Sequence, residues 1–174
     1  MLPSVKIDVD ENTGVWETDG FPMVYVPRHF MLNIHNGVES ALGREAYKQV
    51  LTPSGARAAY RWCEQQAESG RVEPLDVFAF YLERLSARGW GQLRIDEVDL
   101  EGGSATITMK NSIYVLGAAG KADQPVCYMF EGFFVGGIEY LARKSGIAFQ
   151  SVRCEEVQCA AMGHENCVFK VHIA

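Results

Sequence analysis

The chain has 174 residues, 48% of them hydrophobic, and a formal net charge of −6. This size suits one domain with a substantial apolar core, and the acidic balance argues against nonspecific binding to nucleic acids or anionic membranes. No apolar run approaches the roughly 18 residues of a membrane span. No signal peptide is apparent, so we expect a cytoplasmic protein with reduced thiols.

The N-terminal region is expected to be separate from the main domain. Residues 5–9 alternate apolar and polar side chains, and residues with turn chemistry follow them. This pattern is typical of a hairpin or an extended arm. We therefore divide the chain into an N-terminal arm or hairpin, residues 1–23, and one domain, residues 24–174.

Helical patterns begin after this arm. Pro27 suits a first helical turn, and apolar residues then recur at three- and four-residue steps up to a stop at Gly43. Residues 45–51 predict a second, short helix that ends before Pro53. Ser54 is a suitable cap for a third helix, which ends near residue 70.

The rest of the chain alternates between helical and extended patterns. One helix is apolar on nearly every side, as expected of a buried helix, and its glycines Gly132, Gly136 and Gly137 would let another backbone or a ligand come close. The predicted elements are a helix over 74–87, strands over 91–100 and 105–109, the buried helix over 125–143, and strands over 147–158 and 167–173. This order predicts an α+β fold in which N-terminal helices pack on an antiparallel sheet.

Four of the five cysteines fall in the last third of the chain, whereas Cys63 is expected to be a core residue. If the last two strands form a hairpin, Glu156, Cys159 and Cys167 converge at its mouth. Two thiolates and a carboxylate suit zinc, which takes four ligands in a structural site. The candidates for the fourth ligand are Cys127, Cys154 and His164.

The same two thiols, Cys159 and Cys167, also suit a redox pair. A thiol redox switch is therefore the alternative interpretation of this cluster. A redox pair and a metal site differ in a simple measurement: a redox pair holds no zinc when it is reduced, and its oxidation to a disulfide removes two hydrogens from the mass.

Several segments of the chain together resemble the 4-vinyl-reductase domain family, which includes the sensor domains of aromatic-responsive transcriptional activators. The resemblance runs from roughly Val24 to the C-terminus. The segments are Gly89-Trp90-Gly91, Asn111-Ser112, Pro125-Val126-Cys127-Tyr128 with Gly132, and Glu156-x2-Cys159-x2-Met162-Gly163-x3-Cys167. The resemblance implies an α+β fold related to vesicle-tethering subunits, and a zinc ion held by Cys127, Glu156, Cys159 and Cys167.

The family also implies a function for residues 24–174, that of a stand-alone sensor or accessory domain that binds a small hydrophobic molecule in an apolar internal pocket. Core packing is the alternative role of each candidate aromatic residue. The candidates are Phe78, Tyr81, Trp90, Tyr114, Phe130, Phe133 and Phe134. Phenol-type sensors of the family use a pocket histidine, and the lack of histidines between His35 and His164 argues against phenol recognition.

The family is commonly dimeric, so a homodimer is expected. No ATPase or DNA-binding segment is apparent, so any signal would pass to a separate protein partner. One branch of the family is linked to reduction of a vinyl group, which makes a reductase or reductase accessory for a hydrophobic substrate the alternative function. The sequence has no G-x-G-x-x-G fingerprint for a dinucleotide, and a zinc with four protein ligands has no open position for catalysis.

Overall fold

The structure is a computed structural model that describes residues 5–70, 73–118 and 122–174. Helices and antiparallel strands share these residues, so the α+β prediction is confirmed. The helical elements are α1 (Arg28–Leu42), α2 (Arg44–Glu68), α3 (Pro74–Ala87), α4 (Ile113–Ala118), α5 (Met129–Lys144) and the 3-10 turn η1 (Ala160–Met162). The strands are β1 (Asp8–Val9), β2 (Trp16–Thr18), β3 (Phe21–Met23), β4 (Gln92–Asp99), β5 (Ser104–Lys110), β6 (Val152–Gln158) and β7 (Cys167–Ile173).

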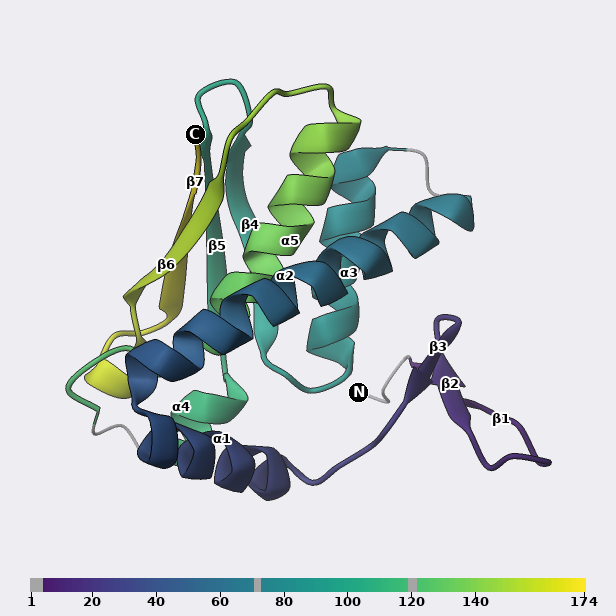
Figure 1. The fold of residues 1–174 in the computed structure, drawn as a ribbon, viewed down its shortest axis with the longest axis vertical. Coiled ribbons are helices and arrows are strands. Elements are labelled where there is room, and N and C mark those ends of the chain that lie inside the picture. Colours follow the sequence, from purple (N-terminus) through teal and green to yellow (C-terminus); the bar gives the residue numbers. More distant parts are fainter. Residues whose placement is uncertain (1–4, 71–72, 119–121) are drawn as a thin grey trace.

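The main sheet has the antiparallel strand order β4-β5-β7-β6. Helices α3 and α5 pack on this sheet, and α2 lies across α5 and α3 (Figure 1). Along β7, Phe169 and Val171 are buried while Lys170 and His172 are exposed. This alternation is typical of an antiparallel sheet with one face toward the core and the other toward water.

The arm predicted over residues 1–23 contains a second, three-stranded sheet of order β1-β2-β3, within described residues 5–23. The turn between β2 and β3 contacts the main domain. Gln66 donates a 2.9 Å hydrogen bond to the carbonyl oxygen of Asp19, and the Asp19 carboxylate pairs with Arg84 at 2.8 Å and Arg88 at 2.6 Å. The division of the chain between residues 23 and 24 stays a prediction.

The prediction of separate helices on either side of Pro53 is wrong, because α2 is continuous through this proline. Proline costs one helical hydrogen bond and crowds the preceding turn. Tertiary packing outweighs that cost here. Gly55 lies so close to α5 that an added Cβ would be 3.1 Å from the Phe133 ring and 3.3 Å from the backbone of Gly132.

The prediction of close approach at the glycines of α5 is confirmed. A Cβ at Gly132 would lie 2.5 Å from the carbonyl oxygen of Thr52 in α2, and one at Gly136 would collide with the carbonyl oxygen of Ala56. A Cβ at Gly137 would collide with the ring of Phe78. Two of these glycines therefore admit a backbone and the third admits a core side chain.

Two predicted boundaries differ from the structure, and α4 was not predicted. The predicted helix over 125–143 begins only at Met129, and the backbone N–H of Cys127 before it bonds the side chain of Glu156. The strand predicted from residue 147 begins only at Val152. Among the described residues, no helix combines the length and apolar character needed to cross a membrane.

Candidate metal centre

Four side chains with metal-binding atoms meet beside the last hairpin. Cys127 comes from the segment before α5, Glu156 from β6, Cys159 from the residue after β6, and Cys167 from the start of β7. One ligand atom of each residue lies within 4.8 Å of the corresponding atoms of the others, and all four residues are buried. This geometry brings together the four residues named from the sequence.

The turn between β6 and β7 brings its two thiols together. The 3-10 turn η1 follows Cys159, and Gly163 ends it in a left-handed conformation with φ of 95°. Within the turn, the N–H of Ala160 donates a 3.4 Å hydrogen bond to the Cys167 sulfur. The two sulfurs of Cys159 and Cys167 are thus held 3.9 Å apart.

None of the thiols in the described residues is in a disulfide. The sulfurs of Cys127 and Cys167 are 3.7 Å apart, far beyond the roughly 2.05 Å of an S–S bond. The Cys127 thiol also donates a 3.1 Å hydrogen bond to the hydroxyl of Ser112. The cysteine sulfurs of the cluster therefore lie close together without being bonded to one another.

The charges of the four side chains are strongly interdependent. Burial, together with a hydrogen bond and a negative charge at Cys159, raises the pKa of Glu156 to about 8. Hydrogen bonds from the Cys127 and Cys167 thiols hold the pKa of Cys159 far below its ordinary value. The same hydrogen bonding, followed by burial, raises the pKa of Cys127. The cluster by itself therefore concentrates its negative charge on Cys159, and a cation would be needed to deprotonate the rest.

One atom of the cluster lacks a hydrogen-bond partner. Glu156 accepts a 2.7 Å bond from the N–H of Cys127 through Oε2, but its buried Oε1 has no partner in the described part of the chain. A buried carboxylate oxygen without a partner is costly. Three thiols with one carboxylate form a soft, four-donor set that suits Zn²⁺. The residues present therefore fit a zinc ion.

An ion pair between buried Glu131 and half-buried Lys48 supports the Glu156 backbone, and no sequence pattern had indicated it. Glu131 in α5 accepts the N–H of Glu156 at 3.2 Å through Oε1, and Lys48 in α2 lies 2.8 Å from its Oε2. Burial raises the pKa of Glu131, and Lys48 opposes that shift. The pair links two helices to the strand that presents Glu156.

The two alternate ligands lie outside the four-residue group. Cys154 is half-buried on β6 and lines a surface groove with Lys48 and Glu155. His164 is exposed in the turn after η1.

Four of the predicted ligand-lining aromatic residues make ring contacts with a fifth, Phe130. The Phe130 ring lies 5.8 Å from Tyr114, 6.1 Å from Trp90 and 5.9 Å from Phe133, all edge to face. These ring contacts are typical of core packing. Five of the seven candidates are buried: Phe78, Tyr81, Tyr114, Phe130 and Phe134. Trp90 also lines a cavity of about 120 Å³.

A histidine reaches this cluster from α1, which the sequence did not indicate. The buried ring of His35 lies 4.4 Å from that of Tyr114 and 5.2 Å from that of Tyr128, measured between centroids. Its Nε2 is 3.6 Å from Glu39, and its buried Nδ1 has no partner among the described residues. Burial lowers the pKa of His35.

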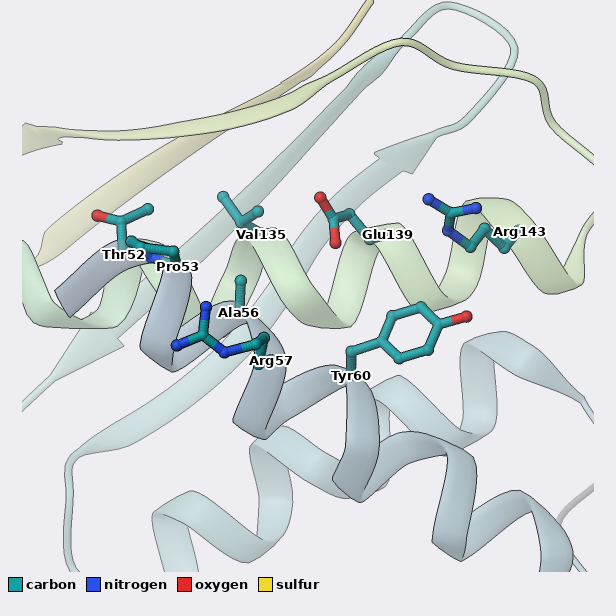
Figure 2. A pocket seen from close by; sticks show the side chains of 8 residues that line it. All are labelled: Thr52, Pro53, Ala56, Arg57, Tyr60, Val135, Glu139 and Arg143. Atoms are coloured by element: carbon teal, nitrogen blue, oxygen red, sulfur yellow. The ribbon is translucent and has the colours of Figure 1, made fainter. Parts of the chain in front are cut away.

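The surface between α2 and α5 has an open groove of about 690 Å³. Figure 2 shows Pro53, Arg57 and Tyr60 from α2 on one side, with Glu139 and Arg143 from α5 on the other. None of its lining residues belongs to the cysteine cluster or to the predicted aromatic set. This groove was not predicted from the sequence.

Two family profiles match the chain. Residues 1–96 match a domain of unknown function, DUF5943, and residues 106–173 match the 4-vinyl-reductase domain. No curated protein matches the chain by sequence.

Solved structures with the same fold have low sequence identity to this chain. The phenol-responsive sensory domain of the transcription activator PoxR, solved with phenol, has a TM-score of 0.77 at 15% identity, over 96% of this chain and 84% of that one. A vinyl-4-reductase family protein from Methanocaldococcus jannaschii has a TM-score of 0.54 at 18% identity, and the match covers 87% of this chain and 84% of that one. Trafficking protein particle complex subunit 3 from Naegleria fowleri, covalently bound to palmitic acid, has a TM-score of 0.55 at 11% identity. That match covers 84% of this chain and 95% of the other.

Proposed function

Because the chain belongs to the family described as a domain of unknown function (DUF5943) and its residues 106–173 form a 4-vinyl-reductase domain, we propose that it is a small-molecule-binding domain with a structural zinc site. The observation that carries the proposal is the buried cluster of Cys127, Glu156, Cys159 and Cys167. Four protein donors would fill the zinc coordination shell, so the metal would hold the fold together.

The binding function is supported by the family and by the fold. The PoxR domain of similar fold was solved with phenol, and the trafficking subunit carries palmitic acid. In the present chain Phe130, the centre of the aromatic cluster, lies at the start of α5, three residues after the metal-site residue Cys127. We propose that zinc fixes this segment and thereby the walls of an apolar ligand site.

Metal content of tag-free protein tests the structural part of the proposal. About one zinc per chain is expected, and chelation should lower the melting temperature. A folded, metal-free protein with an intact count of free thiols would contradict it. A mass two hydrogens lower, with no metal, would instead establish the thiol redox switch of Cys159 and Cys167.

Ligand-detected NMR with neutral single-ring compounds, phenol and benzamide, tests the binding part. Saturable binding of at least one of them is expected. If neither these compounds nor benzoate bound the zinc-loaded, folded protein, the sensor function would be excluded and a structural domain would remain.

We also propose that the domain forms a homodimer through α1. Its side chains Phe30, Ile34 and Leu42, which recur at helical spacing in the sequence, are between 44% and 56% exposed. Exposed apolar residues on one helix are typical of an interface. Native mass of Ile34→Glu should be that of a monomer, while Val157→Glu, at an exposed site on β6, should remain dimeric.

A further inference from the structure

A small cavity lies between the segment that joins β3 to α1 and the turn that joins α3 to β4. Its volume is about 120 Å³. Apolar side chains make most of its wall, among them Met23, Val26, Met31, Trp90 and Ile113. A dry cavity of roughly 150 Å³ holds a benzene ring, so this one suits a molecule of about one ring.

The cavity has two cationic side chains in its wall, Arg28 and Arg88, and its lining includes no carboxylate. Arg28 donates a 2.6 Å hydrogen bond to the carbonyl oxygen of Gly89, which fixes the turn. Arg88 lies 2.6 Å from Asp19 through one terminal nitrogen. The lining is therefore apolar with two guanidinium groups at its edge, one of which is paired with Asp19.

Arg88 has donor capacity that the protein does not use. Its side chain is 8% exposed, and its buried Nε has no hydrogen-bond partner among the described residues. An unsatisfied buried N–H costs free energy that an incoming acceptor would recover. Because a guanidinium binds a carboxylate through charge-assisted hydrogen bonds, a carboxylate is the best-matched acceptor.

The cavity also contacts the proposed ligand-binding cluster. Trp90 lines it and lies 6.1 Å from both Phe130 and Phe133, measured between ring centroids. Ile113, at the start of α4, donates its backbone N–H to the carbonyl oxygen of Trp90 at 3.1 Å. A molecule in the cavity would thus lie against α4 and the ring cluster.

We propose that this cavity binds a small monocarboxylate with a single ring or a short apolar chain, its carboxylate on Arg88 and its apolar part between Met31 and Trp90. This rests on the proposed small-molecule function and names its ligand class. The anion would also share Arg88 with Asp19. Its binding would therefore alter the ion pair that attaches the turn between β2 and β3 to the rest of the protein.

Isothermal titration of the zinc-loaded protein with sodium benzoate tests this, with benzamide as the neutral molecule of matched shape. Benzoate should bind at least about tenfold more tightly than benzamide, as expected of a charge-assisted hydrogen bond. Arg88→Lys keeps the charge beside Asp19 but lacks the planar guanidinium donor. It should weaken benzoate binding by about tenfold or more. Met31→Trp should fill the cavity and abolish binding of both.

Arg57→Lys, in the groove of Figure 2, is the matched control and should bind benzoate like the wild type. Zinc content and melting temperature establish that each variant is folded. Benzoate that fails to bind, or that binds Arg88→Lys and Met31→Trp unchanged, overturns the proposal. Saturable benzamide binding in the same titration, or phenol binding in the NMR experiment, would leave the wider small-molecule function standing.

Discussion

The backbone N–H of Cys127 donates a 2.7 Å hydrogen bond to Oε2 of Glu156, a residue 29 positions later in the chain. This contact ties the segment before α5 to β6 through protein atoms alone. It also leaves Oε1 of Glu156 as the carboxylate atom without a partner in the described residues. Two of the four donors are therefore held in place by the protein itself.

Single cysteine substitutions distinguish Cys127 from its alternate, Cys154. Cys127→Ser should lose zinc and lower the melting temperature, because its sulfur lies 3.7 Å from that of Cys167 inside the cluster. Cys154→Ser is the control and should keep about one zinc per chain, since Cys154 lies outside the group. Elemental analysis of both variants checks this. Zinc loss in Cys154→Ser alone would reverse the assignment.

Zinc binding should release protons, and its affinity should fall as pH falls. The pKa of Glu156 is raised to about 8 by its surroundings in the protein, so near neutral pH this carboxyl is mostly protonated and must lose its proton to bind a cation. Titration of zinc in two buffers of different ionisation enthalpy measures the number of protons released. Glu156→Gln should release about one proton fewer near pH 7. Equal proton release by both proteins would show that zinc displaces no proton from Glu156.

The spacing of residues 156–167 predicted which side chains meet, because a hairpin mouth is a local structure. The family resemblance, not the spacing, singled out Cys127. The support from Lys48 and Glu131 could not be predicted, since it joins residues 83 positions apart. No local pattern encodes such a pair.

Local rules failed where tertiary contacts were stronger. Pro53 predicts a helix end, but Gly55 packs so closely on Gly132 that α2 continues through the proline. No sequence pattern predicted the cavity beside Arg88. It is lined by Met23 and Trp90 together, which belong to distant parts of the chain.

Lys48→Met should destabilise the protein by leaving the Glu131 carboxylate buried without its cation. Glu131 is 5% exposed, and an unpaired buried group of this kind costs about 1–3 kcal/mol. Chemical denaturation measures the free energy of unfolding. Adding Glu131→Gln should restore part of the loss, because an amide oxygen can still accept the N–H of Glu156. A double variant less stable than Lys48→Met would contradict this account.

Gly136→Ala should destabilise the protein because the added methyl group meets the backbone of Ala56 in α2. Overpacking against a backbone costs about 1–3 kcal/mol. Gly37→Ala in α1 is the control, since a Cβ there has no neighbour within 4 Å. It should stabilise by up to about 1 kcal/mol through helix propensity. If both alanines had the same effect on the unfolding midpoint, α2 and α5 would not pack as closely as described.

Acidification should destabilise the wild type more than a variant without the His35 imidazole. Burial lowers the pKa of His35 from 6.5 in the folded state, with Glu39 opposing the shift and Arg44 adding to it. The unfolded chain therefore binds a proton before the folded protein does. Stability from the neutral ring is fully present above 6.5 and is lost as pH falls below it. His35→Phe keeps a ring against Tyr114 but cannot titrate. Its free energy of unfolding should fall less than that of the wild type between about pH 7.5 and 5.5. A wild type that instead gains stability relative to His35→Phe on acidification would mean that Glu39 outweighs burial and that the folded-state pKa is raised.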